Sequence, residues 1–185
     1  MRVVAGRFRG ASLKGPRSDA IRPTSDRMRE SLFNILAHGH DDPVPGARVL
    51  DLFAGTGALG LEALSRGADY ALFVEETVEA RGLIRANVEA LGLTGATRIF
   101  RRDATRLGPA GTVAPFDLAF CDPPYGRGLG TAALEAALAG GWLKPGALAV
   151  LEERAGIEIA ALPGFARVDA RAQGETQLVF LRVEG

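Results

Sequence analysis

The pattern of apolar and polar positions divides the chain into a short amino-terminal part and a longer, regularly alternating part. Residues 2–15 carry short apolar groups separated by glycines, a pattern that predicts a β-hairpin. Segment 41–46 is rich in turn-forming residues and predicts a boundary. We therefore expect a small extension over residues 1–45, followed by a main domain over residues 46–185.

One helix is expected within the extension. Apolar side chains recur at helical spacing between Met28 and Leu36, which gives this helix one apolar face. Thr24 or Ser25 supplies the expected N-cap just before it. The same spacing places Arg29 on another face, away from the apolar one.

The main domain alternates between strand and helix patterns. The expected strands cover residues 48–53, 70–75, 98–102, 116–121 and 147–151, and the expected helices cover residues 58–66, 78–91 and 131–139. Residues 166–170 and 176–183 predict two more strands with no helix between them. Strands that alternate with helices predict a parallel sheet with helices on both faces. The last pair predicts one antiparallel strand at or near an edge. The expected fold is therefore α/β, with seven strands.

Composition restricts the class of protein. The chain has 185 residues, 22 basic and 22 acidic side chains and an apolar fraction of 47%, which is typical of a globular protein. No apolar run reaches the ~18 residues of a membrane helix, and the amino terminus lacks a signal-peptide pattern. Cys121 is the only cysteine, so neither a disulfide nor a zinc cluster is expected. His38 and His40 lack further ligands and are expected to be solvated. We expect a cytoplasmic monomer without a metal.

Charge is distributed unevenly along the neutral chain. Residues 1–30 hold eight basic and three acidic side chains, so this segment carries a net charge of +5 and the remainder −5. Such a basic arm is compatible with a polyanionic partner, and equally with a solvated face. If it binds nucleic acid, the arm arginines are the candidate contacts: Arg2, Arg7, Arg9, Arg17 and Arg22.

A glycine-rich loop follows the first strand of the main domain. Gly55, Gly57 and Gly60 match the string G-x-G-x-x-G between a strand and a helix, and Glu75 closes the next strand. Glycine permits a tight turn and close backbone approach to a ligand, and a carboxylate at the second strand end can accept from both ribose hydroxyls. By itself this pattern also fits a dinucleotide site.

Acidic residues at the other strand ends favour a cationic cofactor. Asp51 lies just before the glycine loop, where it would repel a pyrophosphate and attract a sulfonium or ammonium group. Asp103 ends the third strand, where it can accept from an adenine amino group. In a parallel sheet these carboxyl ends share one edge, the usual ligand site. The arrangement predicts S-adenosylmethionine as the cofactor.

The fourth strand ends in the sequence Asp122-Pro123-Pro124-Tyr125. Consecutive prolines lack N–H donors and fix the backbone, so the Asp122 carboxylate and the Pro123 carbonyl form a rigid acceptor pair. Such a pair can accept both protons of an exocyclic amino group and later receive a proton. The Tyr125 ring can stack on a base. This motif predicts methyl transfer to an amino group on a base.

The same motifs carry a resemblance to a known family. The Asp122-Pro-Pro-Tyr125 motif and the glycine loop resemble those of class I S-adenosylmethionine-dependent amino-methyltransferases, which share a Rossmann-like fold. Segments 2–10 and 22–36 are similar to the RsmD-type 16S ribosomal RNA (guanine-N2)-methyltransferases, and this resemblance covers essentially the whole chain. It implies methylation of one guanine, guanine 966 in the usual rRNA numbering, on the small ribosomal subunit or an assembly intermediate.

The resemblance also implies roles for individual residues. The cofactor-binding candidates are Asp51, Phe53, Gly55, Gly57, Glu75, Asp103 and Ala104; the catalytic candidates are Asp122, Pro123 and Tyr125; Arg22 and Thr24 are expected to border the site. Gln173 departs from the family pattern, which has an aromatic residue there.

Three alternatives stay open on the sequence. The first keeps the chemistry but acts on adenine N6 in DNA or RNA, where the acceptor geometry is the same. The second is an NAD-dependent dehydrogenase, against which Asp51 and the Asp122 motif argue. The third is a non-catalytic RNA-binding assembly factor, against which the intact Asp122 and Tyr125 argue.

Overall fold

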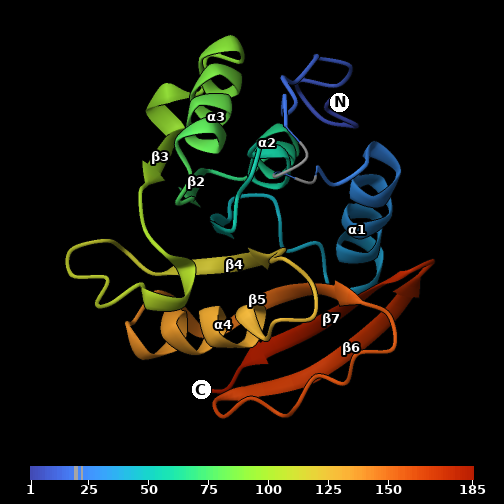
Figure 1. The fold of residues 1–185 in the computed structure, drawn as a ribbon, viewed down its shortest axis with the longest axis vertical. Helices are drawn as coiled ribbons and strands as arrows, with labels where there is room; N and C mark the ends of the chain where they lie inside the picture. The colour runs from blue at the N-terminus through green and yellow to red at the C-terminus, as the bar shows by residue number, and fades with distance from the viewer. Residues whose placement is uncertain (19–20, 22) are drawn as a thin grey trace.

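The computed structural model describes residues 1–18, 21 and 23–185, and these form one seven-stranded sheet with helices on both faces (Figure 1). The strands are β1 (Arg48–Leu52), β2 (Tyr70–Val74), β3 (Thr97–Phe100), β4 (Phe116–Cys121), β5 (Leu143–Arg154), β6 (Phe165–Gln173) and β7 (Thr176–Val183). The α-helices are α1 (Asp26–Gly39), α2 (Ala58–Ser65), α3 (Val78–Ala90) and α4 (Leu129–Ala139). The expected α/β fold with seven strands is confirmed.

The strand order is β3-β2-β1-β4-β5-β7-β6. Strands β1 to β5 pair in parallel, and β7 runs antiparallel to both of its neighbours. The single antiparallel strand is therefore β7, one position in from the edge strand β6. The strand order reverses between β1 and β4, and open sheets of this kind bind ligands beyond the carboxyl ends of the strands at that point.

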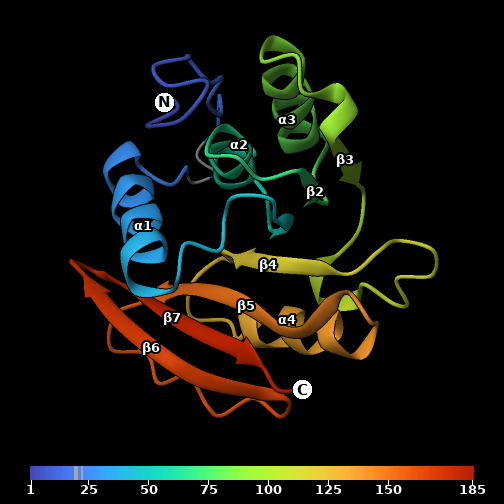
Figure 2. The same ribbon diagram turned by 180° about the vertical axis from the view of Figure 1, so that it is seen from behind.

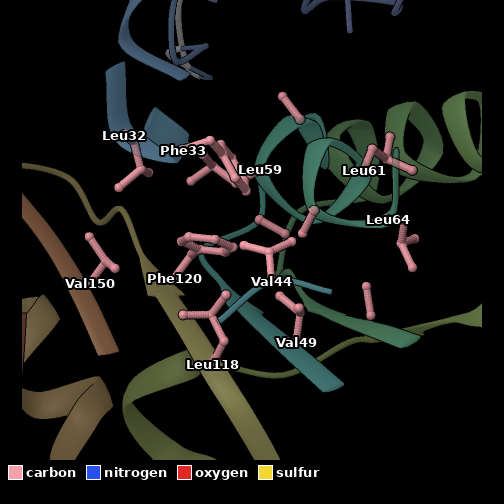
Figure 3. Packing of buried hydrophobic residues seen from close by; sticks show 14 of the residues in the cluster. Leu32, Phe33, Val44, Val49, Leu59, Leu61, Leu64, Leu118, Phe120 and Val150 are labelled. Atoms are coloured by element: carbon pink, nitrogen blue, oxygen red, sulfur yellow. The ribbon is translucent and has the colours of Figure 1, made fainter. Parts of the chain in front are cut away.

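Alternating side chains of the strands build a core on each face of the sheet. Helices α1, α2 and α3 cover one face and α4 covers the other, as both views show (Figures 1 and 2). On the three-helix face, Val49, Leu118 and Phe120 meet Leu59 and Leu61 of α2 (Figure 3). Strands buried on both faces need continuous apolar runs, which explains the composition of β1, β2 and β4.

Helix α1 belongs to this same core. Leu32, Phe33 and Leu36 are buried, and the Phe33 ring lies 5.5 Å from that of Phe120 on β4. Ser25 caps the helix, since its hydroxyl accepts from the Met28 backbone N–H at 3.1 Å. Val3, Leu13 and Val44 lie in the same cluster, so the described part of segment 1–45 shares a hydrophobic core with the sheet, although it precedes the expected boundary.

The expected amino-terminal hairpin forms only as a short, irregular pairing of residues 1–3 with residues 10–13. An antiparallel bridge joins Arg2 and Ser12, and the Val3 and Leu13 N–H groups donate across it to the carbonyls of Ala11 and Met1, each at 2.9 Å. Its backbone also binds α2: the Val4 and Ala5 N–H groups donate to the Glu62 carboxylate at 2.9 and 3.0 Å. Periodicity could not predict this result, because the partners are side chains nearly sixty residues away.

Arg29 is buried, although its spacing places it off the apolar face of α1. Its side chain is 0% exposed, and it donates to the backbone carbonyls of Thr24 and Arg2 and to the Asp26 carboxylate. The buried Glu62 carboxylate lies 3.8 Å from its Nε. Arg29 therefore ties the arm, the start of α1 and helix α2 together.

His40 also differs from expectation. It caps α1, its ring stacks on that of Phe180 at 4.5 Å, and Nε2 lies 3.0 Å from an Asp169 carboxylate oxygen. His38 is exposed at the end of α1. His40 thus joins the end of α1 to the β6–β7 hairpin.

Candidate active site

A pocket of about 780 Å³ opens at the carboxyl ends of the parallel strands, beside the start of α1. Each of the four strand-end motifs contributes residues to this region. Among its lining residues are Thr24, Ser25, Met28, Phe53, Gly55, Glu75, Arg102, Asp103, Ala104, Asp122, Pro123, Pro124, Tyr125, Arg127, Glu152, Arg154 and Thr176. The strand-end acids Glu75, Asp103 and Asp122 therefore meet in one cavity.

The glycine loop forms one wall. Phe53 and Gly55 line the pocket, and both have a positive φ, of 55° and 59°. A non-glycine residue rarely adopts this conformation, so Phe53 is held there by the loop around it. Gly57 is the αL residue that starts α2, and it lies behind the pocket wall.

Asp51 also lies behind the loop. Its side chain is 1% exposed, is not among the lining residues, and accepts from the Gly60 backbone N–H at 3.0 Å. Burial raises its pKa to about 8. Asp51 thus fixes the loop to the start of α2, whereas the sequence placed it against a cationic ligand.

Glu75 is oriented by backbone donors. Oε1 accepts from the Gly55 N–H at 2.9 Å, and Oε2 accepts from the N–H groups of Glu76 and Thr77 at 2.8 and 3.1 Å. These contacts fix the carboxylate where the glycine loop meets β2. Each oxygen can accept more than one hydrogen bond, so the group can still receive hydroxyl donors from a ribose.

Asp103 and Ala104 form the next wall. Oδ1 of Asp103 accepts from the Thr105 hydroxyl at 2.7 Å and from its N–H at 2.9 Å. These hydrogen bonds lower the pKa of Asp103, so it is a carboxylate at neutral pH. It can accept from an amino group, as the sequence predicted.

Asp122 has a contrasting environment. Thr24 donates its hydroxyl to Oδ2 at 2.9 Å, so the segment before α1 contributes directly to this site. Burial, and then the nearby negative charge of Glu152, raise the pKa of Asp122 well above its usual value. An acid that is held protonated more strongly than usual, and that faces a cavity, is a candidate for proton transfer.

Tyr125 connects this end of the pocket to two residues that the sequence did not single out. Its hydroxyl donates to Oε1 of Glu152 at 2.6 Å and lies 3.2 Å from the Thr176 hydroxyl. Burial and Glu152 raise the pKa of this phenol. Glu152 was missed because β5 was expected to end at residue 151, whereas it continues to Arg154. Thr176 begins β7, and only the sheet brings it here.

The arm arginines lie apart from the pocket. Arg2, Arg7, Arg9 and Arg17 are exposed, and none lines the cavity. The Arg7 backbone N–H donates to the Ser65 carbonyl at the far end of α2, about 12 Å along that helix from the glycine loop. Arg22 lies outside the described residues. Among the residues that the structure describes, the basic ones that line the pocket are Arg102, Arg127 and Arg154.

Neither a metal cluster nor a membrane span is found among the described residues. They contain no group of three or more His, Cys, Asp or Glu side chains placed to hold a metal ion. Within the same part of the chain, no helix combines the length and apolar character needed to cross a membrane.

The strand order, the glycine loop and the pocket at the strand ends define a Rossmann-like class I methyltransferase fold. The solved structure of the Escherichia coli protein yhhF matches this chain with a TM-score of 0.83 at 32% identity, and the match covers 100% of this chain and 98% of that one. The family described as Conserved hypothetical protein 95 matches residues 1–182.

The chain belongs to this family, which corresponds to the RsmD-type methyltransferases. Ribosomal RNA small subunit methyltransferase D of Escherichia coli is 38% identical over 82% of this chain and 74% of its own length. The Haemophilus influenzae protein of the same name is 34% identical, over 82% of this chain and 78% of its own length.

Proposed function

We propose that this chain transfers a methyl group from S-adenosylmethionine to the exocyclic N2 of a guanine in 16S rRNA, guanine 966 in the usual numbering. The names of the relatives support small-subunit ribosomal RNA as the substrate. The observation that carries the proposal is the presence of two carboxylate environments in one pocket. Glu75 and Asp103 suit an adenosyl group at one end, and Asp122 suits an amino group at the other.

The residues at the cofactor end fit S-adenosylmethionine. Glu75 would accept from the ribose hydroxyls, and Asp103 would accept from the adenine amino group, while Gly55 lets the backbone approach closely. When bound, S-adenosylmethionine supplies an electrophilic methyl group on a cationic sulfur.

The residues at the acceptor end would orient the amino group. Asp122 accepts one of its protons and the Pro123 carbonyl the other, which directs the nitrogen lone pair into the pocket. Thr24 holds the Asp122 carboxyl in place at 2.9 Å. After transfer Asp122 can take up the proton that the methylated amine releases.

Mapping the product tests the proposal. The purified chain is incubated with S-adenosylmethionine and with small ribosomal subunits from cells that lack this gene, and the methylated nucleotide is located by mass spectrometry. Methyl-N2-guanine at position 966 is the expected product. Methylation of an adenine N6 would support the alternative acceptor. Absence of transfer together with tight NAD binding would support a dehydrogenase.

The cofactor site yields the first mutational prediction. Glu75→Ala is expected to weaken S-adenosylmethionine binding by about 1–3 kcal/mol, because hydrogen bonds to a charged group are lost. Isothermal titration calorimetry measures the change. Glu89→Ala is the matched control, since Glu89 is exposed near the end of α3 and lies away from the pocket. Equal affinities of wild type and Glu75→Ala would contradict the assignment of Glu75.

The second mutational prediction concerns the basic amino-terminal arm. We propose that residues 1–45 contact rRNA through their exposed arginines. The double variant Arg7→Glu and Arg9→Glu is expected to weaken RNA binding and to reduce the slope of log K against log salt by about 1–2, because phosphate contacts release counterions. S-adenosylmethionine affinity should not change.

A charge-matched control distinguishes the arm from general electrostatics. Arg98→Glu and Arg167→Glu make the same charge change at exposed positions on β3 and β6. If both double variants lower the salt slope equally, or if neither does, the arm is a solvated face.

A further inference from the structure

Glu152 is a second carboxyl group at the acceptor end of the pocket. It lies near the end of β5, is 8% exposed and lines the cavity together with Asp122. After burial, the negative charge of Glu152 is the next cause of the raised pKa of Asp122. A buried carboxyl group beside a like charge is costly unless hydrogen-bond donors compensate for it. The proposed function above assigns no role to Glu152.

The orientation of Glu152 is fixed by its neighbours. The Tyr125 hydroxyl donates to Oε1 at 2.6 Å and also lies 3.2 Å from the Thr176 hydroxyl. Tyr125 therefore holds the Glu152 carboxyl, whose charge in turn acts on Asp122. Two carboxyl groups, those of Asp122 and Glu152, thus line the end of the pocket that Thr24 and Tyr125 also line.

Guanine and adenine differ in the hydrogen-bonding groups on their edges, and this difference decides which base fits beside Asp122 and Glu152. Guanine presents two adjacent donors, the N1–H and the N2 amino group, whereas adenine presents an acceptor, N1, beside its amino group. When both are ionised, these two carboxyl groups match the donor pair of guanine. They would leave adenine N1 opposite a negatively charged acceptor.

We propose that Glu152 is the residue that selects guanine, by accepting the N1–H while Asp122 binds the N2 amino group. This inference rests on the proposed function and adds the residue that sets its base specificity. It also explains why a second buried acid is present at the site: the incoming base brings the donors that compensate for the charges of both carboxylates.

The test removes the N1 donor of the acceptor base, a replacement that also turns the 6-oxo group into a 6-amino group. Small-subunit RNA is assembled by ligation with either guanine or 2,6-diaminopurine at the target position and is reconstituted into subunits. Diaminopurine keeps the 2-amino group, but its N1 is an acceptor. The wild-type enzyme is expected to prefer guanine by at least about 100-fold in kcat/KM, because a site built for a donor rejects an analogue that lacks it.

Glu152→Gln should change this preference. The glutamine carbonyl can still accept from Tyr125, and its amide can donate to N1 of diaminopurine. The guanine preference is expected to fall by at least about tenfold. Glu153→Gln is the matched control, because Glu153 is also buried on β5 but binds the Gly126 and Arg154 N–H groups and does not line the pocket.

A second measurement does not require turnover. The ratio of Kd values for the two RNAs, measured with S-adenosylhomocysteine present, should shift in the same direction in Glu152→Gln and remain unchanged in Glu153→Gln. If Glu152→Gln has the same guanine-to-diaminopurine ratios of kcat/KM and of Kd as wild type, Glu152 does not select the base. The proposed function would still stand in that case. If the wild-type enzyme methylates neither RNA, the proposed function itself fails.

Discussion

Asp122→Ala is expected to lower kcat by at least about 100-fold, the usual loss when a general base or positioning group is removed. The carboxyl group faces the pocket, and Thr24 holds it at 2.9 Å. Its removal eliminates both the group that orients the amine and the group that takes up its proton. Affinity for S-adenosylmethionine should change little, because the adenosyl contacts are assigned to Glu75 and Asp103.

Single-turnover methyl transfer with RNA already bound isolates this effect from binding. Asp117→Ala serves as the control, since Asp117 lies on the same strand at its other end, where it pairs with Lys144. Transfer by Asp122→Ala at the wild-type rate would show that the Asp-Pro-Pro-Tyr mechanism is wrong. Weakened cofactor binding with an unchanged rate would place Asp122 in the cofactor site instead.

The same carboxyl group sets a pH dependence. Asp122 accepts a proton only when ionised, and its folded pKa is raised well above 3.8, mainly by burial and then by Glu152. Activity should therefore be lost as pH falls through this raised pKa, at higher pH than an ordinary aspartate would give. The positive charge of bound S-adenosylmethionine favours the ionised form of Asp122. The acid limb of the kcat profile should therefore lie at lower pH than the acid limb of the kcat/KM profile.

Arg29→Leu is expected to lower the free energy of unfolding by about 3–5 kcal/mol, the usual cost of removing one partner from a buried charged network. The change leaves the carbonyls of Thr24 and Arg2 without their donor and removes a charge that lies 3.8 Å from the buried Glu62. Arg66 still binds Glu62 at 2.9 Å, so part of the network remains. Urea denaturation followed by circular dichroism measures the loss.

Arg27→Leu is the matched control. It makes the same substitution two residues earlier in α1, at an exposed position, and should change stability by less than about 0.5 kcal/mol. Equal losses of unfolding free energy in the two variants would show that the loss does not come from the burial of Arg29. The Arg29 variant should also transfer methyl more slowly where it remains folded, because Arg29 holds the backbone of Thr24.

The sequence by itself determined the α/β alternation, the elements of the main domain and the strand-end acids. These features are local: a buried parallel strand needs a continuous apolar run, and the carboxyl ends of parallel strands share one edge. Glu75, Asp103 and Asp122 each follow such a strand, and their convergence in one pocket is therefore implied by the order of residues alone.

Tertiary structure alone decided the roles of the residues between those motifs. Arg29 and Glu62 carry charges, yet both are buried, because the arm folds back on α2. Glu152 reaches Tyr125 because β5 lies beside β4, and Thr176 reaches it because β7 lies beside β5. Asp51 was expected at the ligand and instead supports the loop from behind. In most of these cases the partner lies far away in the sequence, and periodicity carries no information about such contacts.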